Sequence, residues 1–372
     1  MRSPRGYCIA EDDGIRSVKK ISRAGSGGYS LYLPKRWINK WSEAQKKEKE
    51  IEMFEVGDQL IVSPKQSRKT LTKRIEGASQ EEMIYHMLSA YIRGVDDFSM
   101  IQNGLTDVDI SGMRNILRFL DENLMVHTEK NTISYENRPV STYDPGPLIP
   151  LLFDKIIEAE NLAADLVNDC DTNPSRCIHL MRMLYAIEKE DVNRLSLQIF
   201  RNLSRCRSPA RDFIDINFKW SSANMLEIIG DGIYGVVQVV CQSYGIAPDE
   251  LRYPAEYLER KIENRTPVIG GADKLRMQLV IDLREGAVML SKAKEAIISG
   301  DGKGAFEYKD ELREQVRAME AELADSMGEF STSSDVTEES FLSVVLISIR
   351  VREIMYLTKS LTKRAALIYF SE

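Results

Sequence analysis

The stretch Leu226-Glu227-Ile228-Ile229-Gly230-Asp231 predicts how the core of this protein is built. Going outward from it, apolar residues recur at spacings of 3, 4, 3 and 4, as on the buried face of a helix in a bundle. This apolar stripe consists of Leu226, Ile229, Ile233, Val236 and Val240. Beside it runs a polar and partly acidic stripe, which consists of Glu227, Asp231, Tyr234 and Gln238.

Glu227 and Asp231 are two carboxylates on one face of the predicted helix. At a spacing of four residues they repel each other by roughly 0.2–0.5 kcal/mol. The pair therefore needs a counter-charge or full solvation. A hard metal cation, a neighbouring Lys or Arg, or water would each satisfy it.

Residues 230–235 also read G-x-G-x-x-G, the dinucleotide-binding pattern. That motif works in a turn between a strand and a helix. Here the helical stripe continues through all three glycines, and no strand–turn signal precedes them. We therefore expect the glycines to let a neighbouring helix approach closely, although each costs the helix about 1 kcal/mol relative to Ala.

Length and composition indicate a globular protein of two or three domains, with 372 residues, of which 29% are charged and 43% hydrophobic. The longest uncharged apolar run near the C-terminus, residues 341–349, is too short to span a membrane, and the N-terminus lacks a signal-peptide core. The five cysteines show no C-x-x-C spacing: Cys8, Cys170, Cys177, Cys206 and Cys241. We interpret them as reduced core residues, which predicts a cytoplasmic protein without membrane insertion.

Charge is unevenly distributed along the chain. Residues 1–75 hold 17 Lys and Arg against 9 Asp and Glu, a net charge of +8, whereas the whole chain has a net charge of −7. The remainder therefore carries −15. A basic N-terminal part on an acidic body indicates nucleic-acid binding at one end only.

Residues 15–64 predict a small β unit. A strand at 29–33 follows a Gly-rich turn at 25–28 and stops at Pro34, which opens a short helix at 35–41. A second strand at 59–62 follows a turn at 56–58. So few apolar positions can hardly bury a core within one chain. We therefore expect two copies to interlock as a homodimer.

This unit resembles the AbrB/SpoVT-type swapped-hairpin DNA-binding domain, through residues 17–20, the Gly-rich turn, residues 33–35 and residues 56–60. In that family two chains exchange hairpins and present basic loops to DNA. The resemblance implies DNA contacts from Arg16, Lys19, Lys20, Arg23, Lys35 and Arg36. A solvated basic dimer module without DNA affinity is the alternative. Residues 42–55 are longer and more charged than the usual link, so they alter the DNA-facing surface or project as a loop.

Residues 65–79 read as a polar linker whose lysines and arginines offer further phosphate contacts. A small α/β middle region follows at 80–134, with helices at 81–93 and 109–120 and strands at 98–101 and 125–127. A linker containing Pro and Gly closes it at 135–147.

From residue 148 the chain is predicted to be helical. Three amphipathic helices fill residues 148–246, a polar loop spans 247–272, and three more helices fill 272–372. Two consecutive three-helix units are typical of an internal duplication.

The helical part resembles the phosphate-uptake regulator (PhoU) family. The resemblance is carried by the duplicated plan, by residues 187–195 on the second helix and by residues 226–231 on the third. That family has acidic pairs on these helices, which can hold multinuclear iron or zinc. It therefore implies a metal site at Glu227, Asp231, Glu188 and Asp191. Together with the N-terminal unit and the middle region, the chain resembles the archaeal fusion type of this regulator.

The sequence departs from the family pattern at several positions. On the second helix, the non-acidic Lys189 and Asn193 stand where the acidic pair is expected. In the second repeat, Glu353 stands 126 residues after Glu227, and Leu357 replaces the second acid. The resemblance thus implies a weakened first metal site and a lost second one, and carboxylates paired with Lys or Arg are the alternative.

The motifs that would indicate an enzyme are absent. The three histidines (His86, His127 and His179) form no Glu-x-x-His pair, and the chain has no Walker A loop, H-E-x-x-H motif or G-x-S-x-G elbow. A metal-dependent hydrolase is therefore disfavoured, and we interpret His179 as a packed or surface residue.

The sequence thus predicts a multidomain, mainly α protein with a small swapped-hairpin β domain at 1–64, an α/β middle region and two PhoU-like three-helix repeats. The predicted function is a DNA-binding transcriptional regulator linked to phosphate uptake or phosphate signalling. The alternative is an adaptor that does not bind DNA and docks a phosphate transporter ATPase or a sensor kinase. The predicted partners are DNA, a second copy of the chain and such a transporter or sensor protein.

Overall fold

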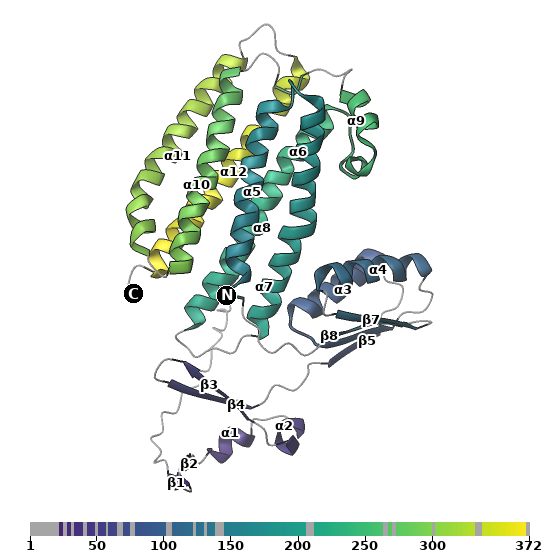
Figure 1. Cartoon of the computed structure of the whole chain (residues 1–372), viewed down its shortest axis with the longest axis vertical. Helices are drawn as coiled ribbons and strands as arrows, with labels where there is room; N and C mark the ends of the chain where they lie inside the picture. Colours follow the sequence, from purple (N-terminus) through teal and green to yellow (C-terminus); the bar gives the residue numbers. More distant parts are fainter. Residues whose placement is uncertain are drawn as a thin grey trace, which may run out of the picture. The chain divides into compact units, whose positions relative to one another are not determined.

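A computed structural model of the chain describes residues 22–24, 28–30, 33–39, 43–48, 51–56, 59–64, 70–74, 79–101, 106–121, 124–129, 132–137, 145–205, 212–262, 267–269, 273–299, 302–331 and 337–369. The protein is mainly helical, as the sequence predicts (Figure 1). Its middle region contains a small four-stranded sheet, of which the sequence analysis predicts two strands. The chain divides into two compact units, Met1–Ser67 and Arg68–Glu372.

The first unit contains two antiparallel hairpins. In one, β1 (Ser22–Ala24) pairs with β2 (Gly28–Ser30), and in the other β3 (Ile51–Val56) pairs with β4 (Gln59–Pro64). Between them along the chain lie α1 (Lys35–Asn39) and α2 (Glu43–Glu48). The Pro34 carbonyl accepts the first hydrogen bonds of α1, so this proline opens the helix as predicted.

Of the two expectations for residues 42–55, the projecting loop is wrong for 43–48 and 51–55, which form α2 and most of β3, and the altered DNA-facing surface stays a prediction. The charges that favour a loop are compatible with a strand here, because every residue of β3 pairs with a residue of β4. Cross-strand pairing outweighs the low intrinsic strand propensity of glutamate. The predicted strand at 29–33 is described only as β2, which ends at Ser30.

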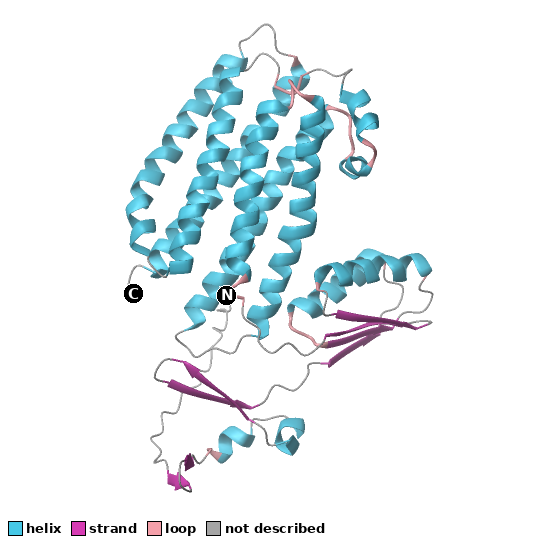
Figure 2. Cartoon of the chain, in the orientation of Figure 1, coloured by secondary structure: helices cyan, strands magenta, loops and turns pink. Residues whose placement is uncertain are grey.

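The middle region is a two-layer α/β structure. Its elements are β5 (Thr70–Arg74), α3 (Gln80–Ile92), β6 (Asp97–Ile101), α4 (Asp107–Leu120), β7 (Leu124–Glu129) and β8 (Thr132–Asn137). The sheet order is β5-β6-β8-β7, parallel between β5 and β6 and antiparallel elsewhere. Figure 2 shows both helices on one face of the sheet, where Phe98, Met100, Ile133 and Tyr135 are buried.

Two strands lie where linkers are expected. β5 falls within 65–79, and its sequence, Thr-Leu-Thr-Lys-Arg, has no buried residue on either face. It is an edge strand, and hydrogen bonds to β6 hold it in the sheet. β8 extends into 135–147. Ile133 and Tyr135 alternate as in a half-buried strand, and that signal outweighs the Pro and Gly residues that follow.

The helical body begins with α5 (Leu148–Asp169). A continuous helical rod follows, made of α6 (Pro174–Ala186), the π-helix η1 (Ile187–Val192) and α7 (Asn193–Arg205), and then comes α8 (Asp212–Ser243). The later helices are α10 (Asp273–Ser299), α11 (Gly302–Ser331) and α12 (Glu338–Tyr369). The predicted polar loop at 247–272 instead contains the 3₁₀-helix η2 (Pro248–Arg252) and α9 (Ala255–Ile262), whose Leu251 and Leu258 are buried.

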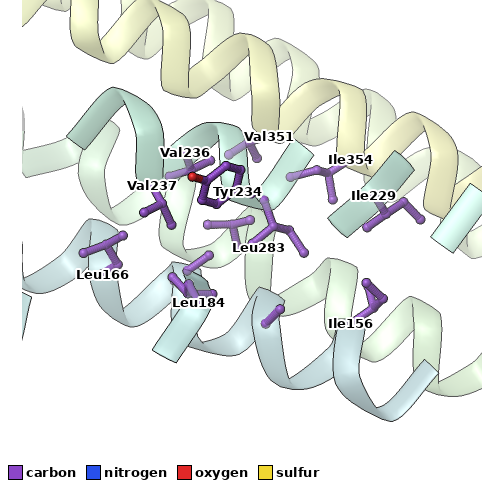
Figure 3. Close-up of a cluster of buried hydrophobic side chains, with 14 of the residues drawn as sticks. Ile156, Leu166, Leu184, Ile229, Tyr234, Val236, Val237, Leu283, Val351 and Ile354 are labelled. Carbon is purple, nitrogen blue, oxygen red and sulfur yellow. The ribbon is translucent and has the colours of Figure 1, made fainter. Parts of the chain in front are cut away.

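All the long helices share one hydrophobic core. Figure 3 shows residues of α5, α6 and α8 meeting Leu283 of α10 and Val351 and Ile354 of α12. The apolar stripe predicted from Leu226 to Val240 is entirely buried, which confirms that α8 is a core helix. Within the described residues, the segment Asp215–Ser243 is long and apolar enough to cross a membrane, but 72% of its apolar window is buried inside the bundle. The core helix of a soluble protein has the same character.

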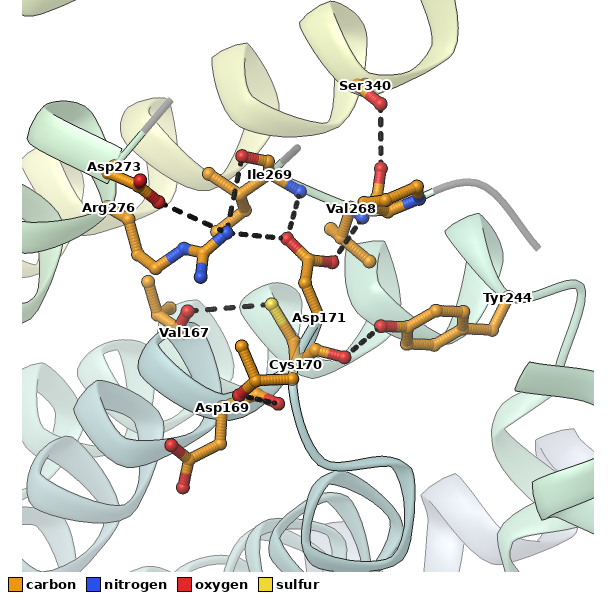
Figure 4. A network of polar contacts seen from close by, with 12 residues as sticks. Val167, Asp169, Cys170, Asp171, Tyr244, Val268, Ile269, Asp273, Arg276 and Ser340 are labelled. Atoms are coloured by element: carbon orange, nitrogen blue, oxygen red, sulfur yellow. Dashed lines mark hydrogen bonds and ion pairs between the residues drawn. The ribbon is translucent and has the colours of Figure 1, made fainter. Parts of the chain in front are cut away.

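The long helices form two groups, α5–α8 and α10–α12, and a polar network joins these groups at one end of the bundle (Figure 4). Asp171, in the turn after α5, accepts hydrogen bonds from the backbone N–H groups of Val268 at 2.5 Å and Ile269 at 2.9 Å. Its Oδ2 also lies 2.9 Å from Nη2 of Arg276 in α10. Beside it, the Tyr244 hydroxyl donates to the carbonyl of Cys170. One carboxylate therefore holds the segment that leads into α10.

Three of the five cysteines, Cys170, Cys177 and Cys241, are free and buried, as predicted for reduced core residues. Burial raises the pKa of the Cys241 thiol to about 12, so this group stays protonated at neutral pH. Cys8 and Cys206 lie outside the described residues.

The middle region is joined to the body by buried arginines of α7. Arg201 donates from Nη1 to the carbonyls of Tyr91 at 3.0 Å and Val95 at 2.9 Å. Nη2 of Arg205 lies 3.0 Å from Oδ2 of Asp96, and Nη2 of Arg201 lies 3.5 Å from Oδ1. We call Arg201, Arg205 and Asp96 the latch. Arg201 and Asp96 are only 2% and 4% exposed, so these charges compensate each other away from water.

Candidate functional site

The acidic stretch that organises the sequence lies in the middle of α8. Glu227 is half-buried and Asp231 is exposed, on the polar side of a helix whose opposite side is core. The three glycines of G-x-G-x-x-G are interior residues of α8, so the strand–turn–helix that binds a dinucleotide is not formed there.

The glycines serve close helix packing, as expected. A Cβ at Gly230 would lie 2.8 Å from Oε2 of Glu188 and 3.1 Å from Cδ1 of Ile156. At Gly232 it would lie 3.0 Å from Cγ1 of Ile354 on α12. Each of these approaches is shorter than ordinary van der Waals contact. The helices on either side of α8 therefore depend on the missing side chains.

The second acidic stretch forms the π-helix η1. Its C-terminal bonds come from Asn193, whose backbone N–H and side-chain amide both donate to the carbonyl of Glu188, the amide at 2.9 Å. The same amide nitrogen lies 3.1 Å from Oε1 of Glu188. The wider π turn directs two neighbouring acids to different helices: Glu188 reaches α8, and Asp191 reaches Lys155 of α5.

Glu188 is a buried carboxyl beside another carboxyl. It is 3% exposed, and its Oε2 has no hydrogen-bond partner among the described residues. Burial, and then the negative charge of Asp231, raises its pKa from 4.5 to about 7, while Lys189 and Asn193 act in the opposite direction. Burial and Asp231 also raise the pKa of Glu227. Glu188, Glu227 and Asp231 thus form one electrostatically coupled group, which we call the acid cluster.

Asp191 lies outside the acid cluster, because its charge is paired with other residues. Its carboxylate lies 3.0 Å from Nζ of Lys155 and 3.2 Å from Nη2 of Arg194. These two cations neutralise it, as in the alternative of carboxylates paired with Lys or Arg. Of the four residues assigned to a metal, the structure therefore brings three together and directs the fourth elsewhere.

A metal ion does not fit the cluster as it stands. Among the described residues, no group of three or more His, Cys, Asp or Glu side chains is arranged to hold one. The cation Lys189 also competes for the position, with Nζ 3.9 Å from Oε1 of Glu188 and 4.4 Å from the ring centre of Tyr234. We derive no step through iron or zinc from this geometry.

Asp231, one member of the acid cluster, lines a groove between α8 and α12 with a volume of about 840 Å³. Its cations are Lys189, Arg350 and Arg352, and its acids are Asp231 and Glu353. The remaining lining is mostly apolar: Ile228, Gly232, Tyr234, Gln238, Ile349, Ile354, Tyr356 and Leu357. Three of these apolar side chains, Ile228, Ile349 and Tyr356, are exposed on the groove surface. The groove is a mixed apolar and charged surface suited to binding another molecule.

The second group of helices lacks an equivalent acid cluster in its described residues. Glu353 pairs with Arg350 at 3.0 Å within α12, and Leu357 lines the groove without charge, as the sequence predicts. Two buried acids that the sequence analysis does not single out lie in the core instead. Asp282 accepts a hydrogen bond from Gln278 at 2.7 Å, and burial raises its pKa to about 7.

Glu160 of α5 is the other unexpected acid. It is fully buried, neither oxygen has a hydrogen-bond partner among the described residues, and burial raises its pKa well above the usual value. A Cβ at Gly286 of α10 would lie 3.1 Å from both oxygens. Position alone could have identified it, because Glu160 stands four residues after Ile156 on the apolar face of its helix.

Of the predicted DNA contacts, Lys35 and Arg36 are exposed on α1. Arg23 lies in β1, next to the turn of the first hairpin. Arg16, Lys19 and Lys20 lie outside the described residues. His179, interpreted as a packed or surface residue, is exposed on α6.

Comparison with known proteins gives no relative to guide this assignment. No model of a protein family matches the chain, and no curated protein matches it either.

Proposed function

We propose that this protein is a DNA-binding regulator connected with phosphate uptake, in which the basic N-terminal unit binds DNA and the acidic helical body receives the signal. The observation that carries the proposal is the separation of charge. Residues 1–75 have a net charge of +8 within a chain of −7, and the first compact unit, Met1–Ser67, holds 13 of their 17 Lys and Arg residues and a net charge of +4. An acidic body repels DNA, so binding is confined to one end of the chain.

The dimeric head is part of this proposal. In the first unit, the described side chains of Ile38 and Val62 are only half-buried, and Ile51 is 38% exposed. Hairpins exchanged between two copies would cover such residues and would place Arg23, Lys35 and Arg36 of both chains on one surface. The link to phosphate, and the duplication of the helical body, are supported by the resemblance of residues 148–372 to the PhoU family.

Salt dependence gives the sharpest test of DNA binding. Each phosphate contact contributes a slope of about −0.9 to log K against log salt. Six contacts from two copies of three basic residues lower the affinity about a thousandfold or more between 50 and 200 mM salt. The full chain should be titrated with DNA from upstream of phosphate-transport genes and with unrelated DNA, across that range.

A triple variant with Arg23→Ala, Lys35→Ala and Arg36→Ala should bind all sequences more weakly and show a flatter salt slope. The matched control replaces three basic residues of the body, Lys292, Arg317 and Lys363, with Ala and should bind as the wild type does. Loss confined to one preferred sequence would mean that the head residues read bases. Absence of affinity for any DNA at low salt would end the regulator proposal.

An adaptor is the second candidate, and the groove between α8 and α12 favours it. Exposed apolar side chains at Ile228, Ile349 and Tyr356 beside charged residues are typical of a docking surface. In this reading the body binds a phosphate transporter ATPase or a sensor protein, and the head serves only to form the dimer. Ile349→Glu should then abolish co-purification with that partner while DNA affinity stays unchanged.

A further inference from the structure

The side of α12 that faces away from the core carries a line of apolar side chains. Eight residues recur there at spacings of 4, 3, 4, 3, 4, 3 and 4, which is the spacing of a coiled-coil seam. We call these residues the outer ridge: Leu342, Leu346, Ile349, Glu353, Tyr356, Ser360, Lys363 and Leu367. All but the half-buried Ser360 are exposed, and five are large and apolar. Among the described side chains of α11, by contrast, no large apolar residue is exposed.

Two hollows lie along the seam between α8 and the outer ridge. One is the groove of about 840 Å³ described above, which Ile349 and Tyr356 help to line. The other has a volume of about 220 Å³ and is lined in part by Leu342 and Leu346, nearer the start of α12. A ridge with hollows beside it is the surface on which the side chains of another helix can interdigitate. The shape of this face therefore fits a helix that lies along α12.

The charges on α12 favour a second copy of this chain as the partner. The first turn contains Glu338 and Glu339, whereas the C-terminal third contains Lys359, Lys363 and Arg364. Two copies that run antiparallel bring the acidic end of each helix beside the basic part of the other, and the opposite ends of their helix dipoles meet. A parallel pair would instead bring like charges together.

The spacing of the outer ridge is also symmetric about its midpoint, which lies between Glu353 and Tyr356. An antiparallel copy can therefore lie ridge against ridge about a two-fold axis, so that each ridge residue faces one of the other copy. In this arrangement Leu342 of one copy faces Leu367 of the other. Glu353 faces Tyr356, whose hydroxyl is a donor for the carboxylate.

We propose that α12 is a self-association surface: two copies of the helical body pack antiparallel through their outer ridges. The proposal goes beyond the proposed function, because it holds whether or not the N-terminal unit binds DNA. Such a dimer would cover the groove between α8 and α12. Another protein could then reach the groove only after the two bodies separate, which is a condition that the adaptor candidate would have to meet.

A second exposed apolar face, on α10, provides a matched control. Met277, Ile281 and Val288 are exposed there. Arg284 lies between them in the sequence and pairs with Asp165 of α5 at 3.3 Å, so this face is interrupted by a charge that is already paired within the chain. We therefore expect the α10 face to stay in solvent when the outer ridges pack.

Cross-linking at the centre of the outer ridge tests the arrangement. In the full chain with Cys8→Ser and Cys206→Ser, Glu353→Cys places one accessible thiol on each copy near the two-fold axis. Helix axes about 8–10 Å apart bring these thiols within reach of a short bismaleimide. Leu342→Cys is the control within the ridge, because the two copies of this position lie about 38 Å apart in the antiparallel dimer. A covalent dimer should form about tenfold faster, or more, from Glu353→Cys.

Two double variants in the Glu353→Cys chain separate the two apolar faces. Ile349→Glu with Tyr356→Glu places four new carboxylates in the dimer interface, so the yield of covalent dimer should fall about tenfold or more. Ile281→Glu with Val288→Glu should leave the yield unchanged. These α10 residues have the same spacing and are 48% and 46% exposed, against 48% and 47% for the ridge pair.

The outcomes decide between the two faces and between the two parts of the chain. If the double ridge variant does not fold, as judged by circular dichroism, Ile349→Glu alone takes its place, with Ile281→Glu as its control and the same expected loss. Cross-linking of Glu353→Cys no faster than that of Leu342→Cys would overturn the proposal, and so would equal yields from both double variants. Because no DNA is present, such a failure leaves DNA binding by the N-terminal unit untouched.

Discussion

The two groups of long helices, α5–α8 and α10–α12, differ most in their second members. The rod of residues 174–205 is interrupted by a π-helix, buries Glu188 and carries the latch arginines, whereas α11 is one unbroken helix of 30 residues. The third helices differ in the same sense. Asp231 on α8 raises the pKa of both Glu188 and Glu227, but Glu353 on α12 pairs with Arg350 of the same helix.

This difference shows that two similar successions of helices can place their acidic side chains in different environments. In the first group, burial and then the negative charge of Asp231 raise the pKa of Glu188 and of Glu227. In the second, the buried Asp282 accepts a hydrogen bond from a neutral partner, Gln278, and burial is the main cause of its raised pKa. Variants in the two groups are therefore expected to differ in their effect on stability.

The largest expected effect concerns the latch. Arg201→Met removes a buried guanidinium, so the Tyr91 and Val95 carbonyls each lose one of their donors and Asp96 has less positive charge around it. Breaking a buried pair from one side costs about 3–5 kcal/mol. Denaturant unfolding should show this loss in the free energy of unfolding. In the second group, Arg317→Ala on the surface of α11 should leave it unchanged, and equal losses in both variants would contradict the latch.

The next effect is a pH dependence. The pKa of Glu188 rises from 4.5 to about 7 on folding, so between these values the folded protein keeps a proton that the unfolded chain has lost. The free energy of unfolding therefore falls as pH rises through this window, on the order of 3 kcal/mol at about 1.4 kcal/mol per pKa unit. Unfolding measured from pH 4.5 to 7.5 should show the decline.

Glu188→Gln should flatten this decline, and the slope that remains comes from Glu160 and Asp282, whose pKa values are also raised by burial. Its matched control is Glu314→Gln on the exposed side of α11, which should keep the full slope. A Glu188→Gln profile as steep as that of the wild type would place the titrating group elsewhere.

The smallest effect compares two helical glycines. Gly230→Ala puts a methyl group 2.8 Å from Oε2 of Glu188, and such overpacking costs about 1–3 kcal/mol. Gly328→Ala on α11 meets nothing within 4 Å and should stabilise the protein by about 1 kcal/mol, the helix propensity difference. The melting temperature should therefore fall for Gly230→Ala and rise for Gly328→Ala. Stabilisation by both would show that α8 and η1 can separate at no cost.

Sequence periodicity predicts the long helices well, because their apolar stripes are packed in one core. Leu226 to Val240 is buried as expected, and the glycine contacts follow from the same stripe. Short edge elements were harder to predict. β5 has exposed residues on both faces and exists through pairing with β6, which no local pattern encodes.

The site could be predicted only in part. Glu227, Asp231 and Glu188 do lie together, since their helices pack side by side. Asp191 is separated from them by a π turn that the sequence does not predict, because residues 187–192 fit the helical pattern on either side. Arg201 and Asp96 are 105 residues apart in the sequence. The local sequence around each of them does not distinguish a buried charged residue from an exposed one. Only tertiary packing makes them a buried pair.

The Asp171 network has a consequence for cooperativity. One carboxylate in the turn after α5 accepts from two backbone N–H groups and from Arg276. This point of attachment adds to the shared core and to the ion pairs Lys294–Asp154 and Arg284–Asp165 in holding the two groups of helices together. If that point is lost, α10 can fray from its first turn while α5–α8 remain folded. Asp171 thus favours all-or-none melting of the body over loss of one group at a time.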